Sequence, residues 1–261
     1  MITIAFHKYQ GAGNDFIIID NREEVFPNNA PQLIEKLCNR KFGIGADGLI
    51  LLEKSTKFDF KMIYFNADGH ESTMCGNGGR CIVAFAKKLH LFDKEITFEA
   101  IDGAHSASIE ADGVKLQMIN IQEVQHHPNH YFVNSGSPHH IILTTHINLC
   151  NVVTEGRKIR YGAPYFEQGS NVNFIEKVSE NHFKIRTYER GVEDETLACG
   201  TGATAVAVAM YDAKMTDCNS LIIETLGGNL EVSFQKENQH FTQVFLKGPA
   251  TFVFNGEIEI R

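Results

Sequence analysis

The chain repeats itself once over a long interval, and this repeat limits the folds it can adopt. The run Cys75-Gly76-Asn77-Gly78 opens one apolar stretch, and Cys199-Gly200-Thr201-Gly202 opens another 124 positions later. Flanking strand-like segments recur at nearly the same offset: 60–63 with 183–186, and 96–99 with 221–224. Solenoid repeats run about 20–50 residues, so a period this long indicates a duplicated domain.

The sequence of each half predicts strands, a loop, a helix that begins just after the cysteine, and further strands. β-Branched and aromatic runs such as 16–19 and 243–246 indicate the strands. The two segments after the cysteines are apolar on nearly every side, which predicts helices buried all round. We therefore expect an α/β (α+β) fold of two pseudo-symmetric domains. Each would be a curved, mostly antiparallel sheet wrapped around a central apolar helix.

The domain boundary is expected where the pattern breaks at His126, His127 and Pro128, since no Gly/Ser-rich linker occurs. The predicted domains are residues 1–122 and 123–250. The strand-like segment 251–261 is expected to close the first domain. A length of 261 residues suits two domains of about 130 residues each.

Composition excludes several classes of function. The net charge of −8 and the isoelectric point of 5.8 argue against a nucleic-acid partner, which requires clustered Lys and Arg. No apolar run reaches the roughly 18–20 residues that span a bilayer, and the first residues do not read as a signal peptide. We expect a cytoplasmic protein that does not associate with membranes.

Six cysteines are present: Cys38, Cys75, Cys81, Cys150, Cys199 and Cys218. A disulfide framework is typical of short secreted chains, and the absence of any CxxC argues against structural zinc. In a reducing compartment a cysteine is either a small buried hydrophobe or a reactive thiol. We expect four of them to be small buried hydrophobic residues: Cys38, Cys81, Cys150 and Cys218.

The two remaining cysteines each stand where a helix should begin. First-turn N–H groups lack intrahelical partners, and the helix dipole adds partial positive charge, so a thiol there ionises more readily. The adjacent glycines let the backbone approach an anion closely. One such element alone is typical of a phosphate loop or a simple cap. Two of them, one per half, are expected to face each other across an interdomain cleft.

Two opposed thiols suit inversion of one carbon. A thiolate removes a proton from one face while a thiol delivers a proton to the other, whereas a single base tends to return its proton to the same face. Helix N–H groups would stabilise the charge that develops on the α-carboxylate. The sequence thus favours an amino-acid epimerase or racemase with Cys75 and Cys199 as acid and base.

Seven ordered blocks resemble the diaminopimelate epimerase family over essentially the full chain: 11–16, 43–48, 65–69, 75–81, 136–139, 171–174, and 188–191 leading to 198–202. The resemblance implies interconversion of L,L- and meso-diaminopimelate for lysine and peptidoglycan synthesis. It also implies a homodimer, and a reaction without cofactor, neither pyridoxal phosphate nor metal.

The resemblance assigns roles to the residues of this chain that stand at the matching motif positions. By this resemblance Cys75 and Cys199 are the acid/base pair. The backbone N–H groups that would hold the reacting carboxylate belong to Gly76, Asn77, Gly200 and Thr201. The substrate-binding set is Asn14, Asn66, Asn171, Glu189 and Arg190, the last four at the distal amino-acid end. Arg190 can grip a carboxylate with two donors and Glu189 can accept from an ammonium.

Three further residues are provisional: His139, Ser137 and Asp47. His139 is similar to a family histidine near the cysteines, and a structural and an active role both stay open. Ser137 stands where many relatives have asparagine. The segment 191–196 makes the spacing from Arg190 to Cys199 one residue longer than is common in the family, which leaves the reach of this loop open.

Four other functions were weighed against this interpretation. A proline or hydroxyproline racemase would share the cysteines but needs no clamp such as Glu189 and Arg190. A phenazine-type isomerase is disfavoured because both cysteines are present. A non-catalytic amino-acid-binding module would leave the duplicated thiols unexplained. A cysteine hydrolase lacks an ordered base paired with one nucleophile.

Overall fold

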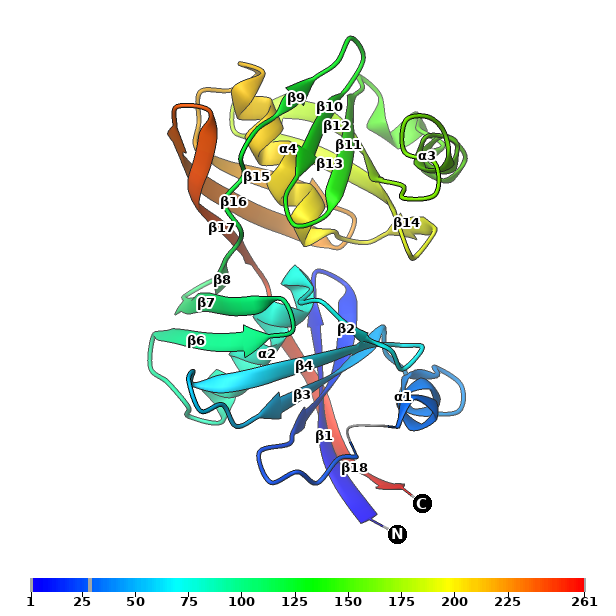
Figure 1. The fold of residues 1–261 in the computed structure, drawn as a ribbon, viewed down its shortest axis with the longest axis vertical. Helices are drawn as coiled ribbons and strands as arrows, with labels where there is room; N and C mark the ends of the chain where they lie inside the picture. Colours follow the sequence, from blue (N-terminus) through cyan, green and yellow to red (C-terminus); the bar gives the residue numbers. More distant parts are fainter. Residues whose placement is uncertain (1, 28–29, 261) are drawn as a thin grey trace. The chain divides into compact units, whose positions relative to one another are not determined.

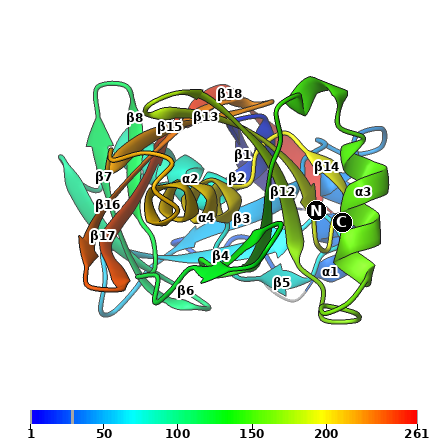
Figure 2. The same cartoon turned by 90° about the horizontal axis from the view of Figure 1, so that it is seen from above.

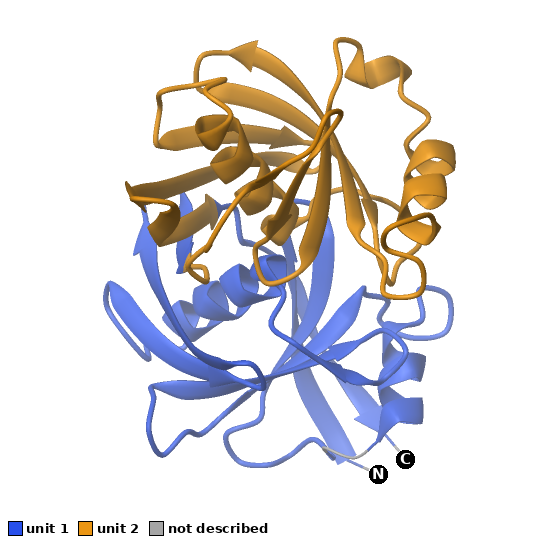
Figure 3. Cartoon of the chain, turned by 45° about the horizontal axis from the view of Figure 1, so that its top comes forward, with its two compact units in different colours: residues 1–116, 248–261 blue, residues 117–247 orange. Residues whose placement is uncertain are grey.

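The structure is a computed structural model that describes residues 2–27 and 30–260. The chain divides into unit 1, residues 1–116 with 248–261, and unit 2, residues 117–247 (Figure 3). The two boundaries lie a few residues before the predicted ones at positions 122 and 250. At the first boundary, residues just after 116 already bond to strands of unit 2. The N–H of Met118 already bonds the carbonyl of Val244, and Ile121 bridges Phe241.

Unit 1 has the following elements (Figure 1): β1 (Ile2–Gly11), β2 (Asn14–Asp20), α1 (Pro31–Cys38), β3 (Gly48–Glu53), β4 (Phe60–Asn66), β5 (Glu71–Ser72), α2 (Gly76–Lys88), β6 (Glu95–Ala100), β7 (Gly103–Glu110), β8 (Gly113–Gln117) and β18 (Thr251–Ile260). Strands β2 and β3 run parallel, as do β4 and β6. The pairs β1–β2, β1–β18, β3–β4, β4–β5, β6–β7 and β7–β8 are antiparallel.

Unit 2 has the same order of elements: β9 (Gln125–His126), β10 (Tyr131–Asn134), β11 (Pro138–Leu143), the 3-10 turn η1 (Ile147–Leu149), α3 (Val152–Tyr161), β12 (Asn171–Ser179), β13 (His182–Glu189), β14 (Asp194–Thr196), α4 (Gly200–Asp212), β15 (Ser220–Thr225), β16 (Gly228–Glu237) and β17 (His240–Gly248). Its parallel pairs, β11–β12 and β13–β15, occur at the steps equivalent to those of unit 1.

The internal sequence repeat therefore corresponds to a repeat of the fold. Strands β1–β8 with α1 and α2 correspond in order and pairing to β10–β17 with α3 and α4. The strand after each repeat also has an equivalent place: β9 pairs with β10, and β18 pairs with β1. The prediction of an α/β fold made of two similar, mostly antiparallel units is confirmed.

A central helix fills each unit. Helix α2 packs against β1, β2, β3 and β7, and α4 packs against β10, β11, β12, β15 and β16 (Figures 1 and 2). Almost every residue from Gly76 to Ala86 and from Gly200 to Met210 is buried. This confirms the predicted burial, with one surprise, since α2 also buries the charged side chain of Arg80 completely.

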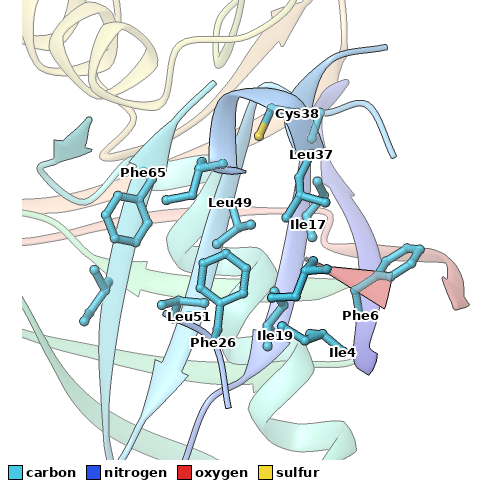
Figure 4. Close-up of a cluster of buried hydrophobic side chains, with 14 residues drawn as sticks. Ile4, Phe6, Ile17, Ile19, Phe26, Leu37, Cys38, Leu49, Leu51 and Phe65 are labelled. Atoms are coloured by element: carbon cyan, nitrogen blue, oxygen red, sulfur yellow. The ribbon is translucent and has the colours of Figure 1, made fainter. Parts of the chain in front are cut away.

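A second helix in each unit was not predicted. Figure 4 shows the apolar cluster beneath α1, in which Leu37 and Cys38 meet Ile17, Leu49 and other side chains of the sheet. Helix α1 is only eight residues long and begins at a proline without a side-chain cap, so its start carries little signal. Helix α3 buries few apolar side chains, although Asn151 caps it by accepting from the N–H of Thr154.

Candidate active site

Cys75 and Cys199 occupy the same position in the two units, the N-cap of the central helix. Both have the extended backbone typical of an N-cap, with φ/ψ of −89°/133° and −122°/112°. The first intrahelical bonds run from Gly79 N–H to the carbonyl of Cys75 and from Ala203 N–H to that of Cys199. The preceding N–H groups lie outside the ladder, at the positive end of the dipole. Both helix starts thus have the polarity of an anion site.

Around Cys75, a chain of side-chain amides connects a guanidinium to a carboxylate. Arg80 Nη2 donates to Asn77 Oδ1 at 2.8 Å, and Asn77 Nδ2 donates to Asn14 Oδ1 at 3.4 Å. Asn14 Nδ2 donates to Asp47 Oδ2 at 2.6 Å. Both amides are oriented by these end groups, because a guanidinium only donates and a carboxylate only accepts. Asn14 Oδ1 consequently lies 3.8 Å from the sulfur of Cys75.

A charged cluster holds Asp47 in place. Arg40 bonds both Asp15 and Asp47 at 2.7 Å, and the buried Lys8 bonds Asp15 at 2.8 Å and also the carbonyl of Gly45. Burial disfavours the charged carboxylate of Asp15, but the hydrogen bonds from Arg40 and Lys8 outweigh it and lower the pKa of Asp15. The cluster joins the start of β2 to the loop before β3, so it fixes the turn that carries Asn14.

That turn between β1 and β2 has two residues, Ala12 and Gly13, both with positive φ (54° and 87°). Such turns match the twist of a hairpin and strongly favour glycine, as at position 13. The turn places Asn14 as the first residue of β2, directly after the loop. Its side chain therefore reaches the start of α2.

Arg80 is the residue near this site that sequence reasoning missed. Besides Asn77 it donates to the carbonyls of Gly76 and Pro249, at 3.2 and 3.3 Å. Burial lowers the pKa of its guanidinium. Burial also raises the pKa of the neighbouring Cys81 thiol to about 12, which fits the predicted packing role of that cysteine.

The other three cysteines with a predicted packing role differ in exposure. Cys38 is buried in the cluster beneath α1, and burial raises the pKa of its thiol to about 12. Cys150 is half-buried and packs against the apolar cluster beneath α3, and Cys218 is half-buried. Within the described part of the chain, none of the six cysteines forms a disulfide.

Around Cys199, hydrogen-bond donors surround the sulfur. The N–H of Gly202 lies 3.4 Å from Cys199 Sγ, and the hydroxyl of Thr201 lies 3.5 Å from it. The same hydroxyl lies 3.0 Å from Nε2 of His139. Cys199 is 7% exposed and His139 is fully buried. The structure thus brings together three residues that the sequence singled out, Cys199, Thr201 and His139.

His139 belongs to a buried polar network that extends to neighbouring strands. Asn173 Nδ2 lies 3.1 Å from His139 Nδ1, and Thr187 donates to Asn173 Oδ1 at 3.0 Å. Burial, aided by the charge of Arg190, lowers the pKa of His139 to about 3, while the Asn173 bond opposes this only in part. His139 is therefore neutral near pH 7 and acts here as a hydrogen-bonding group. Asn173 and Thr187 were not recognised from the sequence.

Three of the four residues predicted at the distal end lie in unit 2, namely Asn171, Glu189 and Arg190. Asn171 is buried, and its Nδ2 donates to Ser137 Oγ at 2.8 Å and to the carbonyl of Pro138 at 3.0 Å. Its Oδ1 accepts from the N–H of Arg190 at 2.9 Å. Asn171 therefore fixes the backbone that carries Arg190, rather than presenting its amide outward. Ser137, which stands in place of asparagine, serves as one of its anchors.

The charged side chains of this group have local partners. Arg190 donates from Nη1 to the carbonyl of Gln168 at 2.9 Å, and Glu189 accepts from the hydroxyl of Thr196 at 2.8 Å. Asn66 lies in unit 1 as the last residue of β4, with its carbonyl accepting from Gly69.

The loop after Arg190, which is expected to be one residue longer than is common in the family, makes a turn around Glu193. Gly191 and Glu193 both have positive φ, 94° and 60°. Glu193 accepts from the N–H of Gly191 at 3.1 Å, from Arg160 at 3.0 Å and from the hydroxyl of Tyr188 at 3.2 Å. These bonds fix the turn before β14, and Cys199 caps α4.

The described residues, 2–27 and 30–260, contain no helix with both the length and the apolar character needed to cross a bilayer. They also gather no group of three or more His, Cys, Asp and Glu side chains suited to a metal ion.

The fold defines a class of two-unit α/β proteins. It is similar to a phenazine biosynthesis protein of the PhzF family from Bacillus anthracis, with a TM-score of 0.80 and 16% identity over 100% of both chains. It is also similar to a probable proline racemase from Agrobacterium radiobacter, with a TM-score of 0.71 and 15% identity over 99% of this chain and 93% of that one. Identities this low define the fold alone.

Sequence comparison identifies the family within this class. The family model described as diaminopimelate epimerase matches residues 6–125 and 131–253. A diaminopimelate epimerase from Flavobacterium psychrophilum is 58% identical over 97% of this chain and 99% of that protein. Another from Chlorobaculum tepidum is 42% identical over 96% and 99%. The chain belongs to the diaminopimelate epimerase family, whose members are isomerases, and the predicted resemblance is confirmed.

Proposed function

We propose that this protein interconverts L,L- and meso-diaminopimelate, a step of lysine and peptidoglycan precursor synthesis, with Cys75 and Cys199 as its acid and base. The observation that carries the proposal is that a chain of this family has a cysteine at the N-cap of the same buried helix in both units. Inversion at one carbon by two opposed groups requires an acid on one face and a base on the other, and a duplicated thiol can supply both.

The reaction conserves protons and electrons without a further reagent. One cysteine thiolate takes the α-proton, the C–H bond breaks, and its electron pair is delocalised into the α-carboxylate. The thiol of the other cysteine delivers its proton to the opposite face, and the electrons of its S–H bond remain on sulfur. The thiolate thus passes from one cysteine to the other. The mechanism requires that both sulfurs reach opposite faces of one carbon.

The helix starts supply the electrostatic part of catalysis. N–H groups of Gly76 and Asn77 on α2, and of Gly200 and Thr201 on α4, would bind the reacting carboxylate as negative charge accumulates on it. These groups are fixed by the helices before substrate arrives, so little reorganisation is needed during proton transfer. We propose that neither pyridoxal phosphate nor a metal takes part.

Recognition of the distal amino-acid end is assigned to Glu189 and Arg190. Arg190 can hold the distal carboxylate with two parallel donors, and Glu189 can accept from the distal ammonium. The support is the anchoring of the backbone before Arg190 by Asn171 at 2.9 Å, which limits where the guanidinium can reach. Asn66, at the end of β4, is assigned to the same end of the substrate.

Incubation with pure L,L-diaminopimelate tests the proposal directly. The assay contains a chelator and no added cofactor, and chiral chromatography follows the isomers. Appearance of the meso isomer until the two isomers reach equilibrium is expected. Binding of diaminopimelate without any inversion would instead favour a non-catalytic binding module, and loss of activity with the chelator would contradict the metal-free reaction.

Proline racemisation is the second candidate, because a probable proline racemase shares the fold. Proline has no distal carboxylate or ammonium, so Glu189 and Arg190 would have no partners in it. The relatives at 58% and 42% identity are both diaminopimelate epimerases, which supports the first candidate. Parallel assays with L-proline and trans-4-hydroxy-L-proline distinguish the two.

We further propose that the protein is a cytoplasmic homodimer. Its support is the exposure of three successive apolar side chains on one strand of unit 1, since Phe252, Val253 and Phe254 of β18 are 40–51% exposed. Exposed large apolar side chains concentrated on one strand are typical of an interface. Light scattering coupled to gel filtration should give twice the chain mass, and Val253→Asp should give the monomer mass.

A further inference from the structure

Arg160, in the last turn of α3, joins two segments of unit 2 that are distant in the sequence. Helix α3 lies beside β14 and is mostly exposed, yet Arg160 itself is only 9% exposed (Figures 1 and 2). Its Nε donates to Glu193 Oε1 at 3.0 Å, and its Nη1 donates to the carbonyl of Phe166 at 3.2 Å. A planar guanidinium has the fixed donors needed to hold both acceptors at once. Arg160 therefore connects the loop 162–170 to the turn before β14.

The loop 162–170 is shaped around this guanidinium. A Cβ built on Gly169 would lie 2.1 Å from Nη1 and 2.4 Å from Cζ of Arg160, so only glycine leaves room for the side chain. Gly169 also has a φ of 64°, which favours glycine. The Cζ of Arg160 lies 4.2 Å from the ring centroid of Tyr161, a cation–π contact. The position of Arg160 is thus fixed by a glycine, an aromatic ring and two acceptors.

The same loop carries the carbonyl that holds the guanidinium of Arg190. Arg190 Nη1 donates to the carbonyl of Gln168 at 2.9 Å, two residues after the carbonyl that Arg160 binds. Arg190 is exposed, and within the described part of the chain this carbonyl is the one hydrogen-bond partner of its guanidinium. The orientation of the Arg190 side chain consequently depends on where the loop 162–170 is held.

The second acceptor of Arg160 fixes the chain on the other side of Arg190. Glu193 Oε1 also accepts from the N–H of Gly191 at 3.1 Å, and the N–H of Glu193 donates to the carbonyl of Glu189 at 2.8 Å. Burial disfavours the charged form of Glu193, but the hydrogen bonds from Gly191 and Arg160 outweigh it and lower the pKa of this carboxyl. The carboxylate therefore stays charged near pH 7 and keeps its ion pair with Arg160.

We infer that Arg160 is a positioning residue that orients Arg190 for the distal carboxylate of the substrate. It acts on the loop through Phe166 and on the turn through Glu193, and so holds the chain on both sides of Arg190. The inference rests on the proposed function, in which Arg190 binds that carboxylate. Arg160 is nearly buried and its charge is compensated by Glu193, so it does not bind the substrate itself. A guanidinium that is oriented before the substrate arrives loses less conformational entropy on binding.

Removal of the Arg160 guanidinium should leave the rest of unit 2 folded. Glu193 would keep two donors, the hydroxyl of Tyr188 at 3.2 Å and a backbone N–H. The loop 162–170 would keep the contact of the Tyr165 hydroxyl with Nδ1 of His140 at 2.8 Å. The expected effect is therefore a loosening of the loop around Arg160 rather than loss of the fold.

Nuclear magnetic resonance of arginine Nε–H groups tests the orientation of Arg190 without any substrate. Arg160→Met keeps an apolar side chain and removes the donors, and Arg157→Met makes the same change at an exposed position of the same helix. The Arg190 signal is assigned by its loss in Arg190→Lys. Its heteronuclear NOE should indicate a rigid side chain in the unmodified protein and in Arg157→Met, and a mobile one in Arg160→Met. Equal rigidity of Arg190 in Arg160→Met and in the unmodified protein would overturn the inference.

Steady-state kinetics with L,L-diaminopimelate separates positioning from a loss of folded protein. In Arg160→Met, KM should rise roughly 10-fold while kcat changes much less, because a remote grip on the substrate is weakened. Arg160→Lys should give an intermediate KM, since an ammonium keeps the charge without the fork of donors. A lower apparent kcat at unchanged KM would indicate a merely structural role and overturn the inference. Absence of turnover in the unmodified protein would instead contradict the proposed function, whereas the resonance experiment would still decide whether Arg160 orients Arg190.

Discussion

The ring Nε2 of His139 lies 3.0 Å from the hydroxyl of Thr201, and the imidazole stays neutral in the folded protein near pH 7. Burial is the main cause, and it lowers the pKa of His139 from an ordinary value of 6.5 to about 3. A family histidine near reactive cysteines suggests a general base. A ring with so low a pKa does not take up a proton near pH 7. Its buried hydrogen bonds instead give it a positioning role toward the hydroxyl beside Cys199.

Neutral His139 should make the fold sensitive to mild acid. Above pH 6.5 both the folded and the unfolded chain hold a neutral ring. Below pH 6.5 the unfolded chain binds a proton that the folded chain excludes, so the stabilisation is lost as pH falls from 6.5 toward 3. We predict that the free energy of unfolding in urea falls between about pH 7 and pH 5, and falls less steeply in His139→Gln.

Glutamine is the suitable replacement because its amide can bond the hydroxyl of Thr201 in place of the ring Nε2 while it cannot titrate. The exposed His146 provides the matched control, and His146→Gln should keep the wild-type slope. An unchanged slope in His139→Gln would contradict the assignment of a neutral buried ring. His140 contributes in the same direction, since burial and nearby His130 lower its pKa to about 4.

Removing either thiol should abolish inversion while the fold persists. Each of Cys75→Ala and Cys199→Ala should lower kcat for diaminopimelate by about 10²–10⁴-fold, since each cysteine is an acid in one direction and a base in the other. The double variant should be little worse than either single one, because groups that act as a unit are not additive. Cys38→Ala is the control, and near-normal turnover in either single variant would refute the two-cysteine mechanism.

Arg190→Lys should impair recognition of the substrate although it keeps the charge. Lysine offers a point charge without the planar fork of arginine, so the two-donor grip on the distal carboxylate is lost. We expect KM for diaminopimelate to rise and free lysine, which lacks that carboxylate, to be a very poor substrate of the unmodified protein. Turnover of lysine or proline at rates near those of diaminopimelate would favour a broader racemase.

Gly202→Ala and Gly78→Ala compare the two helix starts directly. The added methyl at position 202 would press on Asn173 Oδ1 at 2.8 Å, whereas at position 78 it would meet the flexible end of Ile50 at 3.2 Å. The same methyl would also crowd the Cβ and Sγ of Cys199 at 3.3 Å. Because it displaces Asn173 and Cys199 together, Gly202→Ala should lower kcat by roughly 10- to 100-fold more than Gly78→Ala. Similar effects in both variants would indicate that the network does not position the base.

Local sequence was enough to predict the parts of the site that a short motif encodes. Cys75 and Cys199 were predictable because glycine and apolar residues follow both at the same spacing, and the repeat made the pair visible. Arg80, Asn173 and Thr187 were not, since their roles depend on distant partners. Arg80 bonds the carbonyl of Pro249, 169 positions away.

The same reasoning applies to the fold. The repeat and the apolar character after each cysteine predicted two sheets around buried helices, since both are properties of contiguous residues. The motif assigned Asn171 to substrate binding, which stays a prediction, and did not show that its amide also bonds Ser137 and the N–H of Arg190. Only strand register shows that, because β12 lies between β11 and β13.

Deuterium incorporation distinguishes two opposed cysteines from a single base. In deuterated water the donating thiol carries solvent deuterium, and the abstracting thiolate receives the hydrogen of the substrate. The proposed mechanism expects the bound substrate to be shielded from water, so the captured hydrogen should exchange slowly while the complex persists. A single base that exchanges with solvent would label returned substrate and product alike.

The experiment starts from pure L,L-diaminopimelate and samples it early by mass spectrometry after chiral separation. We predict that the meso product carries deuterium at its inverted carbon from the first turnover, while recovered L,L-substrate stays nearly unlabelled. The reason is that in the proposed mechanism each face of the carbon meets a different sulfur, and only the donating sulfur starts with a solvent-derived proton. In Thr201→Ser this pattern should persist, because the hydroxyl beside Cys199 is retained. Early and equal labelling of both pools would rule out two opposed cysteines, whatever the alanine variants show.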